Sequence, residues 1–229
     1  QLSVDARGAD VRELLAQIGQ QANIRMLVAP TARRQINEQL ADIELDEGLR
    51  RTVEWVADGA IGAVREVHAW NRSPASFGVI WRPAERPSGT HELPRGLDWD
   101  LWLGPRAPRA WHPAYAPVTW RGFWDFGGGA MPDMGIHHVD PAFNALSLES
   151  PETVEATAYG DVDPDLCSRG LLVTWRFAAT DKRGPLTVHW YDGGLMPPTP
   201  PDIDTDDPKQ RLGEDADGVL FVGERGYIT

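Results

Sequence analysis

The chain has 229 residues, enough to bury a sizeable hydrophobic core in one large domain or two smaller ones. Its 34 acidic and 22 basic residues give a formal net charge of −12, which argues against non-specific binding to nucleic acid or an anionic membrane, because both require clustered Lys and Arg. The sequence shows no membrane-spanning apolar run and no signal peptide, and its single cysteine, Cys167, excludes an internal disulfide and a cysteine-based zinc site.

The aromatic residues are distributed unevenly along the chain. Residues 1–54 contain none, whereas eight of the ten Trp residues lie between Trp55 and Trp124. Such a change in composition indicates two parts of different origin. We predict a small N-terminal unit over residues 1–45 and a second domain over residues 46–229.

The N-terminal unit and the helix that follows it predict the order β-α-β-β-α. Apolar and polar residues alternate over 2–6 and 36–43, and residues 24–28 form a short apolar run, as expected of strands. Asp10 and Asp46 are favourable N-cap residues for two helices whose apolar positions recur at helical spacing.

This stretch resembles the short N-terminal domain of secretin and TonB proteins. The matching segments are Leu2–Ala6, Ala9–Leu15, Asn23–Val28 and Ile43–Leu49. The resemblance implies a periplasmic docking unit that is not an enzyme. A small βαββα fold without that function remains the alternative, since the matching segments consist mostly of hydrophobic patterning.

The second domain is predicted to be α+β: an open, mostly antiparallel sheet of about five strands with crossing helices. The predicted strands cover residues 61–70, 153–159, 171–177, 186–191 and 219–228, and a helix follows the glycine run Gly127–Gly129. Residues 73–119 are dense in Pro and Trp and poor in periodicity. We expect this long Trp-rich loop to be a packed arm that covers the sheet or grips a neighbouring subunit, with a sugar-stacking surface as the alternative.

The helix after the glycine run carries the candidate site. Asp133, His137 and Asp140 are spaced by four and three residues, which stacks their side chains on one helical face. An imidazole flanked by two carboxylates is suited to proton transfer near neutral pH. The alternative is a structural network in which His137 hydrogen-bonds both carboxylates. His138 points about 100° away and is expected in packing or at the surface.

Residues 46–229 resemble the C-terminal domain of the Gfo/Idh/MocA oxidoreductases. The resemblance implies an open sheet that covers a nicotinamide, NAD or NADP, bound by an N-terminal Rossmann domain, and that holds a sugar- or polyol-like substrate. Several blocks in the family's order carry it: Glu47–Val56, Gly59–Trp70, Leu97–Pro105, Trp120–Ala130, Asp133–Pro141 and Phe221–Gly226.

The resemblance also implies roles for single residues. Asp133 would orient or bind a substrate hydroxyl, and His137 would take or return a proton as hydride moves, so both are expected to be catalytic. The expected substrate-binding residues are Trp120, Arg121, Asp140 and Tyr191.

The chain departs from the family pattern in two motifs. The dinucleotide fingerprint G-x-G-x-x-G after a first strand is absent, and so is the Glu-Lys-Pro motif that supplies the family's catalytic lysine. We therefore expect a truncated member that lacks its own Rossmann domain, so that binding of NAD(P) and dehydrogenase activity by this chain alone are in doubt. The competing hypothesis is a non-catalytic binding or assembly module, which docks through its N-terminal unit and forms a homo-oligomer through the open sheet.

Other candidate sites carry less weight. Asp133 and His137 could bind a metal together with His68 or His189, but two ligands on one helix are weak evidence and we predict no metal site. The acidic run over residues 202–207 is predicted to be a solvated loop. Cytoplasmic localisation is favoured, and a periplasmic one would follow if the N-terminal resemblance is functional.

Overall fold

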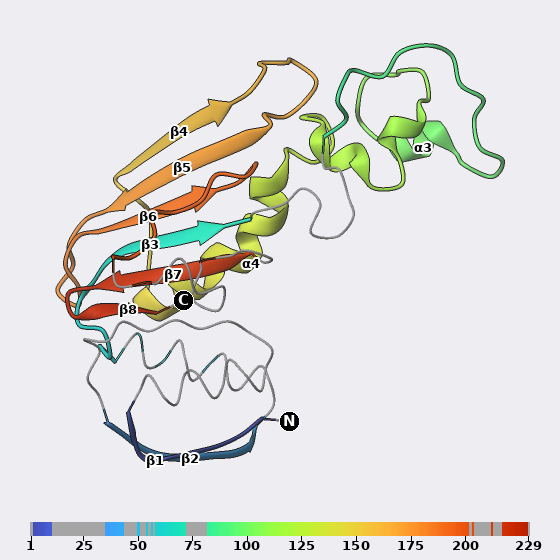
Figure 1. The fold of residues 1–229 in the computed structure, drawn as a ribbon. Coiled ribbons are helices and arrows are strands. Elements are labelled where there is room, and N and C mark those ends of the chain that lie inside the picture. Colours follow the sequence, from blue (N-terminus) through green and yellow to red (C-terminus); the bar gives the residue numbers. More distant parts are fainter. Residues whose placement is uncertain are drawn as a thin grey trace.

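The computed structural model describes residues 2–10, 35–43, 50, 54, 56, 58–71, 82–201, 203, 212 and 217–228. Six strands form the main sheet in the order β4-β5-β6-β3-β7-β8 (Figure 1). Their bounds are β3 Val64–Trp70, β4 Thr153–Tyr159, β5 Gly170–Phe177, β6 Leu186–Tyr191, β7 Gly218–Gly223 and β8 Gly226–Ile228. Only the central pair β3–β6 is parallel, so the predicted α+β fold with a mostly antiparallel sheet is confirmed.

The last predicted strand differs from the structure. Residues 219–228 were expected to form one strand, but they form the hairpin β7–β8 with a turn at Glu224 and Arg225. The backbone N–H groups of these two residues donate to the carbonyls of Ala63 and Ile61, which fixes the turn against the start of β3. This turn is the reason why the sheet has six strands.

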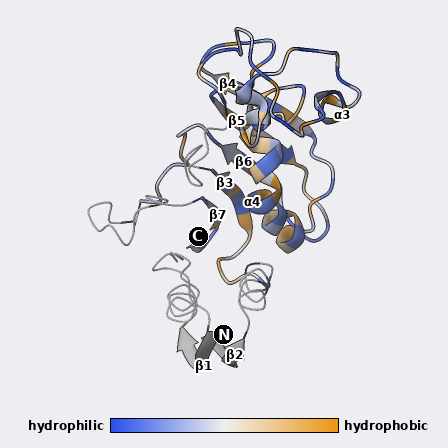
Figure 2. Cartoon of the chain, turned by 90° about the vertical axis from the view of Figure 1, so that its right-hand side faces the viewer, coloured by the Kyte–Doolittle hydropathy of each residue, from blue (hydrophilic) through white to orange (hydrophobic). Residues whose placement is uncertain are grey.

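The helix α4, Ala130–Leu146, packs across one face of the sheet, over β3, β6 and β7 (Figures 1 and 2). Its small residues Ala142 and Ala145 are buried in a core with Val67, Val188 and Phe221. Because successive side chains of a strand point to opposite faces, Glu66 and His68 lie on the other side of β3. There, a second core surrounds Trp70, Tyr191, Leu220 and Tyr227.

The described part of the Trp-rich segment builds a core of its own beyond the end of the strands (Figure 1). It contains the helix α3, Trp99–Leu103, which Asp98 caps, and the short 3-10 helices η1, Pro113–Tyr115, and η2, Thr119–Gly122. Trp99 stacks on Trp102 with ring centroids 4.7 Å apart. The expected arm was to cover the sheet or grip a neighbouring subunit, whereas the described segment packs on itself and on the β4–β5 connection through the Phe123–Leu166 bridge.

A separate two-stranded sheet lies at the N-terminal end. β1, Leu2–Asp10, pairs antiparallel with β2, Gln35–Ile43, which confirms strands at two of the predicted positions. Asp10 belongs to β1 in the structure. The predicted helix after Asp10, the strand over 24–28 and the Asp46 cap lie outside the described residues.

The described helices include none with the length and apolar character that a membrane span requires.

Candidate functional site

The glycine run Gly127–Gly129 folds back against η2. The N–H of Gly129 donates to the carbonyl of Arg121 at 2.8 Å, and the N–H of Gly127 donates to the carbonyl of Phe123 at 2.9 Å. A Cβ atom on Gly127 would lie 2.4 Å from the Cα of Arg121, so a larger residue does not fit there. The run therefore holds Arg121 close to the first turn of α4.

Three of the predicted site residues meet at this turn. The Nε of Arg121 donates to Oδ2 of Asp133 at 3.2 Å, and the Arg121 guanidinium lies 4.4 Å from the centroid of the Trp120 ring. Asp133 lies in the first turn of α4, where the helix dipole favours a negative charge. Both partners of the ion pair remain partly exposed, so the Asp133 carboxylate is oriented but still accessible.

His137 and Asp140 continue the same helical face into solvent. Both side chains are exposed, and within the part of the chain that the structure describes no hydrogen bond reaches the His137 ring. The Asp140 carboxylate accepts from Nδ2 of Asn144 at 2.9 Å. The alternative, a structural network in which His137 hydrogen-bonds Asp133 and Asp140, is therefore not present among the described residues. The stripe faces away from the sheet, with an imidazole free to meet a ligand.

His138 has a different environment. Its ring stacks on Trp190, with centroids 6.1 Å apart, and its Nε2 lies 3.5 Å from Oδ2 of Asp217. This agrees with one of the two expected positions of His138, in packing. Successive residues of a helix point about 100° apart, so His138 faces the sheet while His137 faces solvent.

A cavity of about 430 Å³ lies beside the start of α4. Gly128 and Gly129 line it together with Pro132, the residue before Asp133. The rest of the lining includes charged, amide and aromatic side chains, among them Asn71, Arg82, Trp124, Tyr159, Arg169 and Asp192. A cavity of this size, with a few polar groups among aromatic ones, has the properties of a small-molecule site.

Residues 48–180 match the family described as the oxidoreductase family, C-terminal alpha/beta domain, of the Gfo/Idh/MocA proteins. The match covers more than half of the chain. The chain belongs to this family. A comparison with curated proteins found no match. The matched range includes α4 and its glycine run, and thus the candidate site of this oxidoreductase domain.

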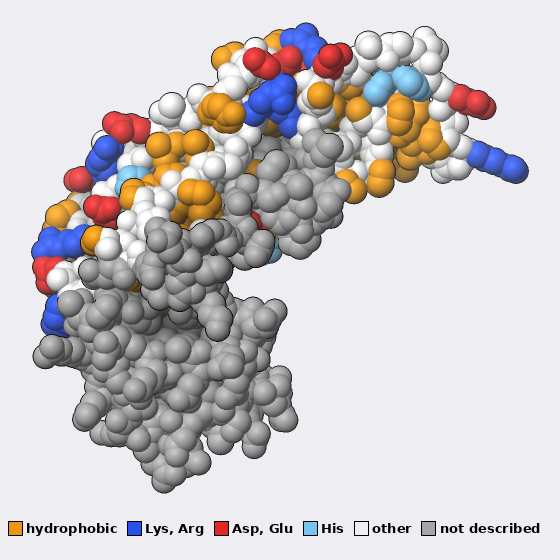
Figure 3. Space-filling view, viewed as in Figure 1, with side chains coloured by type: hydrophobic (Ala, Val, Ile, Leu, Met, Phe, Trp, Pro, Cys, Tyr) orange, Lys and Arg blue, Asp and Glu red, His pale blue; other side chains and the backbone are white. Residues whose placement is uncertain are grey.

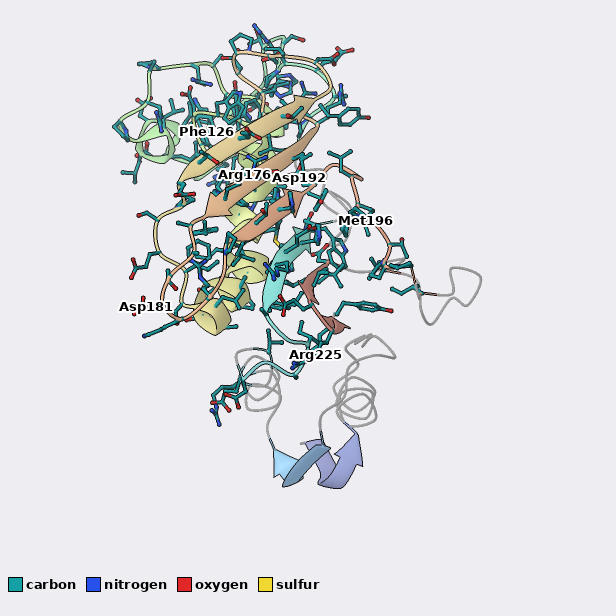
Figure 4. The ribbon with its side chains drawn as sticks, turned by 90° about the vertical axis from the view of Figure 1, so that its left-hand side faces the viewer. Phe126, Arg176, Asp181, Asp192, Met196 and Arg225 are labelled. Atoms are coloured by element: carbon teal, nitrogen blue, oxygen red, sulfur yellow. The ribbon has the colours of Figure 1, made fainter. Side chains whose placement is uncertain are left out.

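Asp192 is the main cavity residue that the sequence analysis missed. It is buried at the end of β6 (Figure 4), where its carboxylate accepts from the N–H of Leu171 at 2.6 Å and from Nε1 of Trp190 at 2.8 Å. Burial raises the pKa of Asp192 to about 6, against these hydrogen bonds. A carboxylate directly after an apolar strand and before two glycines was the available signal.

The structure does not bring Tyr191 to the other predicted residues. Trp190 and Tyr191 are neighbours on β6 and point to opposite faces of the sheet. Trp190 lies under α4, whereas the Tyr191 hydroxyl contacts Nδ1 of His68 at 2.9 Å on the other face. Tyr191 is thus separated from Asp133 by the sheet itself.

Cys167 lines the cavity but is buried, and burial raises the pKa of its thiol to about 11. The thiol is therefore protonated at neutral pH, and a protonated thiol is a weak nucleophile. A metal site that joins His137 to His68 or His189 does not form, because the latter two lie with Glu66 on the face turned away from α4.

Proposed function

We propose that this domain binds a sugar- or polyol-like substrate in the cavity beside the start of α4 and assists its oxidation or reduction. Asp133, His137 and Arg121 do not line the cavity themselves, and the observation that carries the proposal is the glycine run that joins the cavity to α4. One glycine run lines the cavity, orients Asp133 through Arg121, and begins the helix on which His137 is exposed.

The lining of the cavity supports this substrate class. Asn71, Arg82 and Arg169 offer donors to hydroxyl oxygens, and Asp192 is an acceptor. Trp124 and Tyr159 present aromatic surface against which the apolar face of a sugar ring can pack. About half of the Trp124 side chain is exposed, so a ligand bound in the cavity can reduce its contact with water and alter its fluorescence.

The proton chemistry would fall to the two residues of α4. Asp133, held by Arg121, would accept a hydrogen bond from the reacting hydroxyl and fix its position. His137 would take the hydroxyl proton during oxidation and return it to the carbonyl oxygen during reduction. General acid–base assistance of this kind contributes roughly a hundred- to ten-thousand-fold in rate.

The family's nicotinamide cofactor would accept or supply the hydride when bound. The exposed side of α4 offers Asp133 and His137 to such a ring. The glycine run does not suit the cofactor's diphosphate, because it follows a 3-10 helix instead of the strand that precedes a dinucleotide-binding turn. Among the described residues we assign no site for the diphosphate.

Two measurements on the full chain test the proposal. Titration with myo-inositol and glucose should change the tryptophan fluorescence saturably, and Trp124→Phe should remove most of that change. With NADH or NADPH and the oxidised sugars, cofactor consumption should fall at least a hundredfold in His137→Ala. Ile136→Ala, an exposed position next to His137 on α4, is the matched control and should keep full activity.

Sugar binding without any response to NADH or NADPH would contradict the catalytic part and favour a non-catalytic binding module. Turnover that survives His137→Ala in a folded protein would contradict the assigned proton transfer. Absence of both sugar binding and turnover would overturn the proposed function as a whole.

A further inference from the structure

A cluster of potential metal ligands lies on the face of the sheet opposite α4. β3 and β6 are parallel neighbours, and their register pairs His68 with His189. Glu66 precedes His68 by two residues and therefore shares its face. One ligand atom from each of Glu66, His68 and His189 lies within 4.8 Å of the other two.

Hydrogen bonds already hold one nitrogen of each imidazole. Nδ1 of His68 lies 2.9 Å from the Tyr191 hydroxyl, and Nδ1 of His189 lies 3.0 Å from the Thr174 hydroxyl. Both hydroxyls can accept a hydrogen bond from an Nδ1–H group. Histidines that bind metals usually make this second contact, which fixes the ring and leaves Nε2 as the ligand atom.

The remaining contacts point to one centre. Nε2 of His68 lies 3.1 Å from Oε2 of Glu66, and the two imidazole rings are stacked with centroids 4.9 Å apart. His68 is buried and Glu66 is about half exposed, so the cluster is anchored in the sheet and open to solvent on one side. An ion can enter from that side, and water can complete its coordination.

The charge of the surroundings suits a cation. The Glu66 carboxylate places a negative charge next to the two imidazoles. Arg176, a positive group that acts on His189 (Figure 4), is paired with Glu155 at 3.0 Å. Figure 3 shows histidine, acidic and basic side chains exposed together on the face of the sheet that it presents.

We propose that Glu66, His68 and His189 bind one divalent transition-metal ion, of which Zn²⁺ is the best match to two imidazoles and a carboxylate. Zinc binds nitrogen and carboxylate oxygen at about 2.0–2.2 Å, so the three ligand atoms must approach one another and the stacked rings must tilt. Glu66, as an exposed side chain, can supply most of this movement. The proposal goes beyond the proposed function, because its residues lie on the opposite face of the sheet from Asp133 and His137.

Calorimetric titration of the metal-free full chain with ZnCl₂ tests the site, together with visible absorption of the Co²⁺ form. We expect one ion per chain and the absorption of a tetrahedral or five-coordinate Co²⁺ centre. Glu66→Gln should weaken Zn²⁺ binding at least tenfold, and His189→Asn at least a hundredfold. Thr174→Val should weaken it roughly 10- to 100-fold through the lost hydrogen bond.

The matched control is the exposed His91, whose ring centroid lies 4.3 Å from that of His112. His91→Ala should leave the stoichiometry and affinity unchanged. No saturable binding to the wild type would overturn the proposal. Zn²⁺ binding that is lost in His91→Ala but retained in Glu66→Gln would also overturn it. Because Glu66 is about half exposed, a loss of binding in Glu66→Gln would not be explained by misfolding.

Discussion

At the scale of single residues, the Arg121–Asp133 pair shows how short contacts prepare the site. Arg121 is packed over Trp120 and donates to Asp133. The orientation of the carboxylate therefore depends on an aromatic side chain that takes no part in the proposed proton transfer. His137 lacks such support among the described residues. The proposed proton transfer therefore combines one oriented group with one free group on consecutive turns of α4.

Asp192 gives a prediction about pH at the same scale. Its pKa is raised from the ordinary 3.8 to about 6, first of all by burial. Between these values the folded state binds the proton more tightly than the unfolded state, so the contribution of Asp192 to stability is greatest below this window and falls as the pH rises through it. Asp192→Asn removes this titration. The unfolding free energy of the wild type relative to the variant should therefore fall by on the order of 2–3 kcal/mol between about pH 4 and pH 7.

Urea unfolding of both proteins across this pH range measures that difference. Other carboxylates titrate in both chains and cancel in the comparison. A difference that stays constant with pH would contradict the burial of an ionisable Asp192.

At the scale of elements, the glycine run decides where α4 begins. Gly127 touches the backbone of Arg121 so closely that even a methyl group must displace η2 or the helix. Gly127→Ala should lower the unfolding free energy by about 1–3 kcal/mol through this overpacking. Because the same displacement moves Arg121 from Asp133, the variant should also lose the sugar-binding signal of Trp124.

Gly184→Ala is the matched control for that prediction. The added Cβ would meet only the end of the Arg65 side chain, at 3.8 Å, and no positive φ is involved. Chemical denaturation and fluorescence titration of the two variants separate a specific effect from a general one. Equal stability of Gly127→Ala and the wild type would contradict the described contact.

At the scale of the whole molecule, the described residues form distinct hydrophobic cores. The core around Trp99, Tyr115 and Phe123 shares no residue with the core between the sheet and α4. In Figure 4, Phe126 marks the α3 end of the molecule and Arg225 the opposite end of the sheet. We therefore expect the Trp-rich arm to open locally while the sheet stays folded.

Hydrogen exchange measured by mass spectrometry tests this expectation. Phe123→Ala should remove about 3–5 kcal/mol of packing from the arm and accelerate exchange over residues 97–126. Protection in β3, β5 and β6 should stay unchanged. Val188→Ala, in the core under α4, should instead reduce protection across the sheet. Equal loss of protection in the arm and the sheet of Phe123→Ala would show a single cooperative unit.

Much of the architecture could be predicted because it is encoded locally. The strands predicted over 153–159 and 186–191 are present as β4 and β6. In β6 the alternate residues Leu186, Val188 and Trp190 face a core, as period two requires, whereas all residues of β4 are exposed. The hairpin β7–β8 was missed because its turn is fixed by hydrogen bonds to residues more than 150 positions earlier in the chain. The stripe of Asp133, His137 and Asp140 followed from helical spacing alone.

The sequence by itself determined the α+β class, the family, and the helical face that carries Asp133 and His137, because periodicity and short motifs are properties of neighbouring residues. Only the tertiary structure decided that Asp192 lines a cavity beside the glycine run, that Tyr191 lies across the sheet from Asp133, and that Glu66, His68 and His189 meet. The register of β3 on β6 and the side of the sheet that α4 covers depend on contacts between residues far apart in the chain, which no local pattern specifies.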